Sequence, residues 1–375
     1  DFTAGLVQYA DNGKLLPRGA CSGGYSFIMT SCPSTSMIVS AYMRGILTKT
    51  NARHAFDLIK SNHAEGGMMS YESADDLLYY IQNGYCPGNA GKTLEWAFED
   101  WGAAMMAKKL GLKNDYKNFL KRSMGWTPLY CDSLGLVFPK DKLGRWVHLD
   151  PLSGQGWVES NSWQATWSLS HDLPRLISKM GGSEKFCDKL NYAFEKAQSS
   201  DFVASYSNGY VSYANQPGCS NAHLFSYAGK PWMTQYWVRK VREQAYGGIT
   251  PDKGYGGHDE DEGQMGGISA LMSIGLFSVT GCESLVPYYD ITSPIFDKII
   301  ISLDSKYCKG KTFTIVTHNN SPSNCYIQSA KLNGTEWNYS QLEHDVFQKG
   351  GTLELWLGDK PNEDWGKLKY FNQYK

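Results

Sequence analysis

Residues 92–111 read KTLEWAFEDWGAAMMAKKLG, and their apolar residues recur every three or four positions. This spacing places side chains on one face of an α-helix. Eight other segments before residue 284 share the pattern: 36–47, 51–62, 73–83, 115–124, 162–182, 183–197, 230–247 and 265–277. We therefore expect the first three quarters of the chain to be mainly helical.

Helices of similar length joined by Gly- and Pro-rich loops are typical of an α/α toroid. A closed toroid of six helical hairpins needs twelve helices, whereas the pattern predicts only about nine or ten. Residues 1–284 are therefore predicted to form an incomplete α/α toroid catalytic domain. The missing helices are expected before Asp1.

The pattern changes to strands after residue 284. Segments rich in β-branched residues cover 298–304, 311–319, 326–334 and 351–359, with turns at Asn-Gly and Gly-Gly. Residues 285–375 are therefore predicted to form a β-rich C-terminal region.

Composition excludes several classes of protein. The formal net charge of −1 argues against a dedicated nucleic-acid binder, which would carry a basic excess. No apolar run reaches the roughly 18–20 residues that span a bilayer, and no signal peptide is visible. Twelve Trp and twenty-four Tyr suit carbohydrate binding, although packing explains most aromatics equally well.

Nine cysteines are present, and none forms a CxxC pair, so neither a zinc ribbon nor a redox motif is expected. Most should be buried as small apolar residues. Cys308 and Cys325, both in the β-rich region, are the best candidates for a disulfide.

The most unusual stretch is GYGGHDEDEGQMGG, residues 254–267, which gathers the acids Asp259, Glu260, Asp261 and Glu262. Clustered acids repel one another, and this cost is accepted where a metal ion or a proton transfer uses it. The alternative is a solvated acidic loop before a helix that starts near Gln264, where the helix dipole favours negative charge. Both interpretations remain open.

Glu159 is a second candidate, because it lies between Trp157 and Trp163 just before a predicted helix. A carboxyl group against aromatic rings is kept protonated by desolvation, which suits a general acid. The alternative is a carboxylate that interacts with the helix dipole. Glycoside cleavage with inversion needs one acid and one base carboxyl about 6.5–9.5 Å apart, and Glu159 with Asp259 and Asp261 is a plausible set.

Residues 213–240 are a third candidate region. Asn215, Gln216 and Tyr227 have side chains that can hydrogen-bond sugar hydroxyls, although the segment also reads as a structural loop before a helix. His171 and Asp172, expected within a helix, are interpreted as a buried, satisfied pair in preference to an orienting pair.

Long motifs in this chain resemble the signature of glycoside hydrolase family 92. They cover residues 84–101, 156–164, 171–182, 224–240, 254–282, 288–303 and 350–366. The similarity runs in order from about residue 8 to about residue 366.

The resemblance implies an α/α six-hairpin toroid, preceded by a β-sandwich domain that is missing from this chain. It assigns Glu159 as general acid, Asp261 as general base and Asp259 as its partner in positioning water. It also implies a Ca²⁺ ion that contacts the 2- and 3-hydroxyls of mannose, with ligands expected near Asp259 and Cys219.

Substrate contacts are predicted at Asn215, Gln216, Trp157 and Glu95. The chain departs from the family where Asn215-Gln216-Pro217 replaces a triplet that commonly contains Glu, and again over residues 19–33. Glu159 is retained, which favours ordinary glycosides over mannose-1-phosphodiesters.

The expected function is calcium-dependent, inverting exo-hydrolysis of terminal α-mannosides, with α-1,2 linkages favoured, in N-glycans or mannan. The alternatives are a mannosyl-1-phosphodiester hydrolase and a non-catalytic mannan-binding protein. The partner would be a mannose-containing oligosaccharide, and the protein is expected to be secreted or periplasmic.

Overall fold

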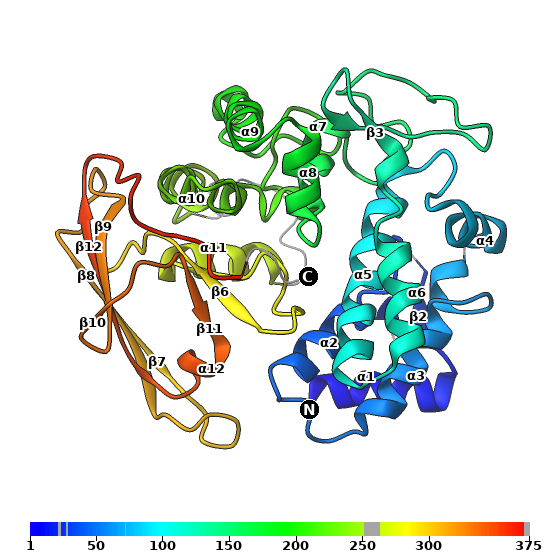
Figure 1. The fold of residues 1–375 in the computed structure, drawn as a ribbon, viewed down its shortest axis with the longest axis horizontal. Helices are drawn as coiled ribbons and strands as arrows, with labels where there is room; N and C mark the ends of the chain where they lie inside the picture. Colours follow the sequence, from blue (N-terminus) through cyan, green and yellow to red (C-terminus); the bar gives the residue numbers. More distant parts are fainter. Residues whose placement is uncertain (22–23, 28, 72, 251–262, 371–375) are drawn as a thin grey trace. The chain divides into compact units, whose positions relative to one another are not determined.

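The computed structural model describes residues 1–370 except 22–23, 28, 72 and 251–262 (Figure 1). Contacts divide the chain into two compact units. Unit 1 comprises Asp1–Asp172 and Thr280–Leu285, and unit 2 comprises Leu173–Val279 and Val286–Lys375. As predicted, the chain is mainly helical with strands gathered toward its C-terminus.

Unit 1 is built from helices with short strand pairs. The helices are α1 (Phe2–Gly13), α2 (Ser34–Met43), α3 (Ala52–Asn62), α4 (Ala74–Asn83), α5 (Ala90–Lys109), α6 (Lys113–Ser123) and α7 (Ser162–Ala165). The strands are β1 (Gly19–Cys21) with β2 (Gly24–Ser26), and β3 (Tyr130–Cys131) with β4 (Leu136–Val137). Short 3₁₀ helices cover Met68–Ser70, Thr127–Leu129 and Thr166–Ser168.

Helix α5 is the most enclosed element of unit 1, and it packs against α2, α3 and α6 (Figure 1). Burial on nearly every side requires apolar residues on nearly every side. The sequence supplies them by alternating large residues such as Trp96 and Trp101 with Ala and Gly, and fifteen of the twenty residues are buried. The buried acids Glu99 and Asp100 are exceptions to this apolar pattern.

Unit 2 begins with helices and ends with sheets. The helices are α8 (Leu173–Lys179), α9 (Ser183–Ala197), α10 (Pro231–Tyr246), α11 (Gln264–Ile274) and α12 (His344–Phe347). Three 3₁₀ helices cover Gln198–Ser200, Gln216–Gly218 and Asn221–Ala228. Helix α10 starts at Pro231, whose missing N–H is no loss in a first turn, and it packs on the 3₁₀ helix Asn221–Ala228, on α11 and on β9.

Two sheets follow. The smaller has the order β11 (Gln341–Glu343), β6 (Tyr288–Ile291), β5 (Leu276–Phe277). The larger has the order β10 (Thr335–Glu336), β9 (Tyr326–Leu332), β12 (Gly351–Gly358), β8 (Thr312–His318), β7 (Lys298–Ser302). Strands β12 and β8 are parallel, and the other pairs are antiparallel. The predicted Asn-Gly turn is confirmed, since Asn333 and Gly334 take φ values of 51° and 79° between β9 and β10.

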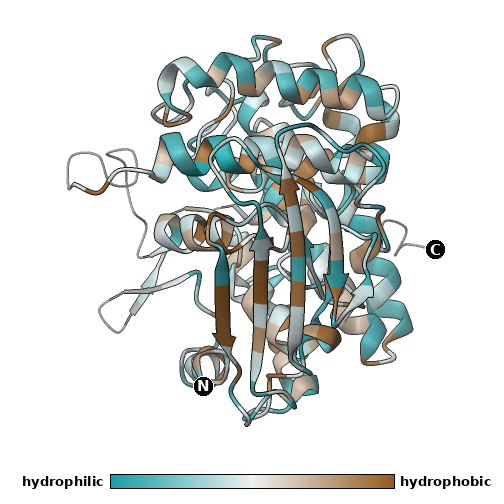
Figure 2. Cartoon of the chain, turned by 90° about the vertical axis from the view of Figure 1, so that its left-hand side faces the viewer, coloured by the Kyte–Doolittle hydropathy of each residue, from teal (hydrophilic) through white to brown (hydrophobic). Residues whose placement is uncertain are grey.

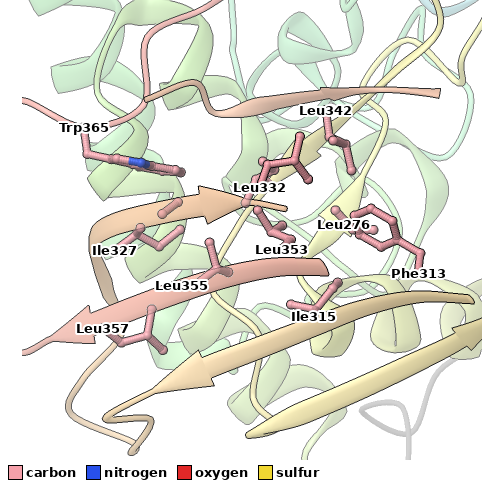
Figure 3. Close-up of a cluster of buried hydrophobic side chains, with 12 residues drawn as sticks. Leu276, Phe313, Ile315, Ile327, Leu332, Leu342, Leu353, Leu355, Leu357 and Trp365 are labelled. Carbon is pink, nitrogen blue, oxygen red and sulfur yellow. The ribbon is translucent and has the colours of Figure 1, made fainter. Parts of the chain in front are cut away.

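The larger sheet is apolar on one face. Its strands mix hydrophobic and hydrophilic residues along their length, and β7 is the most continuously hydrophobic (Figure 2). Alternate residues of β8 and β12 point into the core, as the period of two requires. Figure 3 shows the side chains that meet there: Leu276, Phe313, Ile315, Ile327, Leu332, Leu342, Leu353, Leu355, Leu357 and Trp365.

One predicted helix is wrong in its extent. Residues 162–182 form α7, a 3₁₀ turn and then α8, because Pro174 favours the start of a helix and restricts the residue before it. The pattern also missed α1, in which only Val7 and Ala10 are buried, so its apolar stripe is weak. The 3₁₀ helix at Asn221–Ala228 was expected to be a loop.

The predicted domain division at residue 284 and the toroid remain predictions. The change from helices to strands falls close to that residue, but the contacts draw the boundary of the units elsewhere.

The structure describes the side chains of eight of the nine cysteines, and none of these eight is in a disulfide. Cys308 and Cys325 are among them, so the disulfide predicted between these two residues does not form. Cys308 is half-buried, and the other seven are buried as expected. Within the described residues, no helix combines the length and hydropathy that a membrane crossing requires.

The core of the sheet provides a stability prediction. Ile315 on β8 is 1 % exposed, whereas Ile300 on β7 is 60 % exposed. Ile315→Ala should lower the free energy of unfolding by about 2–5 kcal/mol through lost burial and a cavity. Ile300→Ala should change it by less than about 1 kcal/mol. Urea unfolding of both variants tests this, and equal losses would contradict the assignment of the core face.

Candidate functional site

The loop that carries Glu159 lies directly on the first turn of α5. The amide of Ala90 donates to the carbonyl oxygen of Gly156 at 2.8 Å. A Cβ atom on Gly91 would come within 3.1 Å of the Val158 nitrogen, so a larger residue at position 91 would make a close steric contact with this loop. The backbone leading to Glu159 is therefore fixed by the N-terminus of α5.

Glu159 itself has a rare backbone conformation. Its φ of 49° lies in the left-handed region, which costs a non-glycine residue about 1–3 kcal/mol. On its C-terminal side, the buried Asn161 caps α7 by accepting from the Gln164 amide at 3.0 Å. Such strain persists only where the surroundings impose it, and it is concentrated at functional sites. The half-buried Glu159 carboxyl is thus presented from a rigidly held turn.

The two tryptophans flanking Glu159 are almost enclosed. Trp157 is 8 % exposed and Trp163 is 9 % exposed. Trp157 therefore has little surface to offer a sugar within unit 1, and its substrate contact remains a prediction.

Glu95 lies on the second turn of α5, on the same helix as the anchor of the Glu159 loop. Its Oε2 accepts a hydrogen bond from the Thr30 hydroxyl. Glu99 follows one turn later on the same face, and both of its carboxyl oxygens accept from the Cys32 amide, at 2.8 and 2.9 Å. The segment 29–32 thus contacts two successive acids of α5.

Burial raises the pKa of Glu99 to about 8, and the nearby Glu95 carboxylate adds to this shift. Glu283 lies close by in the same unit. Burial raises its pKa well above the usual range, and Glu99 raises it further. The Oε2 of Glu283 has no hydrogen-bond partner, and it occupies the space that a side chain at position 102 would need. Glu99 and Glu283 are therefore both stable as neutral acids near neutral pH.

Asp100 shows how the same helix accommodates a buried acid that is fully paired. It accepts from His63 Nδ1, Tyr80 OH and Arg122 Nε, each at 2.8 Å.

Sequence reasoning missed Thr30, Glu99 and Glu283. Acids at successive positions in a helix that is apolar all round were the available signal for Glu99.

Three further candidates lie on one turn of unit 2. Asn215 is buried and caps a 3₁₀ turn by accepting from the Gln216 amide at 2.9 Å, while the Gln216 side chain is exposed. The buried Cys219 thiol donates to the Asn215 carbonyl at 3.5 Å. The structure thus brings Asn215, Gln216 and Cys219 together.

Tyr246 connects this turn to the start of α11. It is the last residue of α10, and its hydroxyl donates to the Tyr213 carbonyl at 2.6 Å. The same hydroxyl lies 3.6 Å from Met265 Sδ, near the start of α11. The chain therefore leaves α10 and enters α11 beside the 213–219 loop, but Asp259 and Asp261 lie outside the described residues.

Of the two predicted calcium ligands, the structure describes Cys219. The described residues contain no group of three or more His, Cys, Asp or Glu side chains that could hold a metal ion. Calcium prefers oxygen ligands, so Cys219 would have to contribute its carbonyl and not its thiol. Asp259, the other predicted ligand, lies outside the described residues.

Three other candidates are interior residues. Tyr227 is 5 % exposed, and its hydroxyl donates to the Asp290 carboxylate at 2.9 Å. His171 and Asp172 are buried in unit 1, where His171 Nε2 lies 3.0 Å from the Ser123 carbonyl and Asp172 accepts from Trp126 Nε1. Both residues are buried as expected, but they lie in the turn before α8 and not within a helix.

Comparison with known proteins identifies related chains. Residues 1–359 match the family described as glycosyl hydrolase family 92 catalytic domain. An uncharacterized secreted glycosidase of Arthroderma benhamiae is 25 % identical over 387 residues, which covers 92 % of this chain and 47 % of that protein.

Solved structures are also similar. A family GH92 α-mannosidase from Bacteroides thetaiotaomicron, whose structure with mannoimidazole is known, has a TM-score of 0.85 at 25 % identity and covers 97 % of this chain and 47 % of its own. A family GH92 inverting mannosidase of the same organism has a TM-score of 0.83 at 29 % identity, with 98 % and 52 % covered. The chain spans about half the length of these relatives.

The buried Glu99 predicts a pH dependence of stability. Between about pH 4.5 and pH 8 the folded chain retains a proton that the unfolded chain has released, so this group stabilises at low pH and the stability is lost as pH rises. Glu99→Gln cannot titrate. Its free energy of unfolding should fall less steeply across this window, by roughly 1 kcal/mol per pH unit.

Urea unfolding between about pH 5 and pH 8 measures the difference. The control is Glu65→Gln, a change at an exposed glutamate of the same unit, which should follow the parent protein. Parallel pH profiles for Glu99→Gln and the parent would contradict a neutral Glu99.

Proposed function

Because the chain belongs to glycosyl hydrolase family 92, we propose that its protein is an exo-acting α-mannosidase that works with inversion. The observation that carries the proposal is the family match over residues 1–359. The named relatives support the substrate class, since two are mannosidases and one of them binds mannoimidazole. One relative is also named as inverting.

In this proposal Glu159 protonates the leaving oxygen of the glycoside. The left-handed turn at Glu159 and its attachment to α5 support the role, because a general acid must be held in a fixed direction. Asp261, with Asp259, would deprotonate the attacking water on the opposite face of the sugar. Asn215, Gln216 and Glu95 are each proposed to bind sugar hydroxyls.

Calcium dependence is part of the proposal. Residues 259–262 are all acidic, which supports it. In the sequence they lie between α10, which ends beside the 213–219 loop, and α11, which begins there. A bound Ca²⁺ would supply a positive charge for two adjacent mannose hydroxyls.

We further propose α-1,2-linked mannose of N-glycans or mannan as substrate, a toroid completed by sequence outside this chain, and a β-sandwich domain in the longer protein. The coverage of about half of each relative supports the last point. Secretion is proposed because one relative is a secreted glycosidase.

Glu159→Gln tests the general acid. It should lower kcat on α-1,2-mannobiose by about 100-fold or more, because the leaving sugar needs a proton. A dinitrophenyl α-mannoside has a leaving group that needs none, so it should be cleaved nearly as fast as by the parent protein.

The control for this experiment is Glu65→Gln, which should retain both activities. Comparable losses on the two substrates in Glu159→Gln would rule out the acid assignment while leaving mannosidase activity in place.

Chelation tests the metal. Mannose release from α-1,2-mannobiose by the full-length protein should be lost in EDTA and restored by added Ca²⁺, with β-mannose as the first product by NMR. Undiminished release in EDTA would contradict calcium dependence, and α-mannose would contradict inversion.

A further inference from the structure

Residues 29–32, here called the strap, place the Thr30 hydroxyl on Glu95. Thr30 is 8 % exposed, and its Oγ1 donates to Glu95 Oε2. Its neighbours Met29 and Ser31 have φ values of 68° and 65°. Two left-handed non-glycine residues around one threonine cost about 1–3 kcal/mol each, so the surroundings must impose this shape.

Arg18 stabilises this backbone conformation through hydrogen bonds to the strap's carbonyls. Its Nε donates to the Ser31 carbonyl at 2.8 Å, and its Nη1 donates to the Met29 carbonyl at 2.5 Å. Its Nη2 donates to the Met68 carbonyl at 3.1 Å, which connects the strap to a neighbouring 3₁₀ helix. A planar guanidinium with several fixed donors restricts the carbonyls it binds more than a single donor would.

Glu99 also stabilises the strap, through the Cys32 amide. Both of its oxygens accept the Cys32 amide, two residues after Thr30 and one helical turn below Glu95. The strap is thus held by Arg18 through its carbonyls and by Glu99 through its amide. The Thr30 hydroxyl of the strap donates to Glu95, whose side chain is only half-buried.

We infer that Thr30 is a positioning residue that fixes the Glu95 carboxylate for a mannose hydroxyl, with the strap as its support. The inference rests on the proposed function, and it adds a residue that acts through Glu95 without touching the sugar. A hydrogen bond from a held hydroxyl removes rotamer freedom from a glutamate, which lowers the entropic cost of binding.

A double-mutant cycle tests the inference in the full-length protein. Thr30→Val removes the hydroxyl at nearly constant volume, and KM for α-1,2-mannobiose should rise about fivefold while kcat stays within about twofold. Thr30→Ser keeps the hydroxyl and should restore KM. Because Thr30 acts through Glu95, Thr30→Val combined with Glu95→Gln should be no worse than Glu95→Gln alone.

The control is Thr127→Val, which removes a hydroxyl of the same unit that donates to the Met124 carbonyl. It should leave KM unchanged. Calorimetry on the same variants measures their affinity for mannoimidazole, and so gives the coupling between Thr30 and Glu95 without turnover.

Additive losses in the cycle, no rescue by Thr30→Ser, or an unchanged KM in Glu95→Gln would overturn the inference while mannosidase activity stands. A parent protein that neither turns over mannobiose nor binds mannoimidazole would overturn the proposed function and the inference with it.

Discussion

Helix α5 constrains unit 1 because it is enclosed by protein yet carries three acids on two adjacent turns. Each acid is accommodated differently: Asp100 by a cation and two further donors, Glu99 by an amide and a raised pKa, and Glu95 by a hydroxyl at the edge of the burial. The helix also anchors the Glu159 turn at its first residue. Core packing and the candidate site therefore share one element.

The helices and the C-terminal strands could be predicted from sequence where burial follows a simple period. The segment 92–111 and the strands around Asn333 and Gly334 are examples, since their side-chain pattern and turn residues agree. The break before α8 could not be predicted by periodicity, because apolar spacing continues across a change of helix. Helix α1 was missed for a different reason: only Val7 and Ala10 are buried, so its apolar stripe is weak.

The candidate site was less accessible to sequence reasoning. Glu159 and Asn215 were found because their motifs are local, and the structure adds the left-handed turn and the cap that hold them. Thr30 and Glu283 were missed because their importance comes from contacts across 65 positions to Glu95 and from packing against Gly102. Pairings that distant leave no trace in a spacing pattern.

The cysteines have a practical consequence. Of the eight cysteines whose side chains the structure describes, Cys308 is the one that is not buried, and all eight are unbridged. Among these eight, a maleimide dye should therefore react first at Cys308, in the turn that leaves β7, where its amide donates to the Asp304 carbonyl. The natural sequence thus offers a position for a spectroscopic probe of unit 2 without any engineered residue.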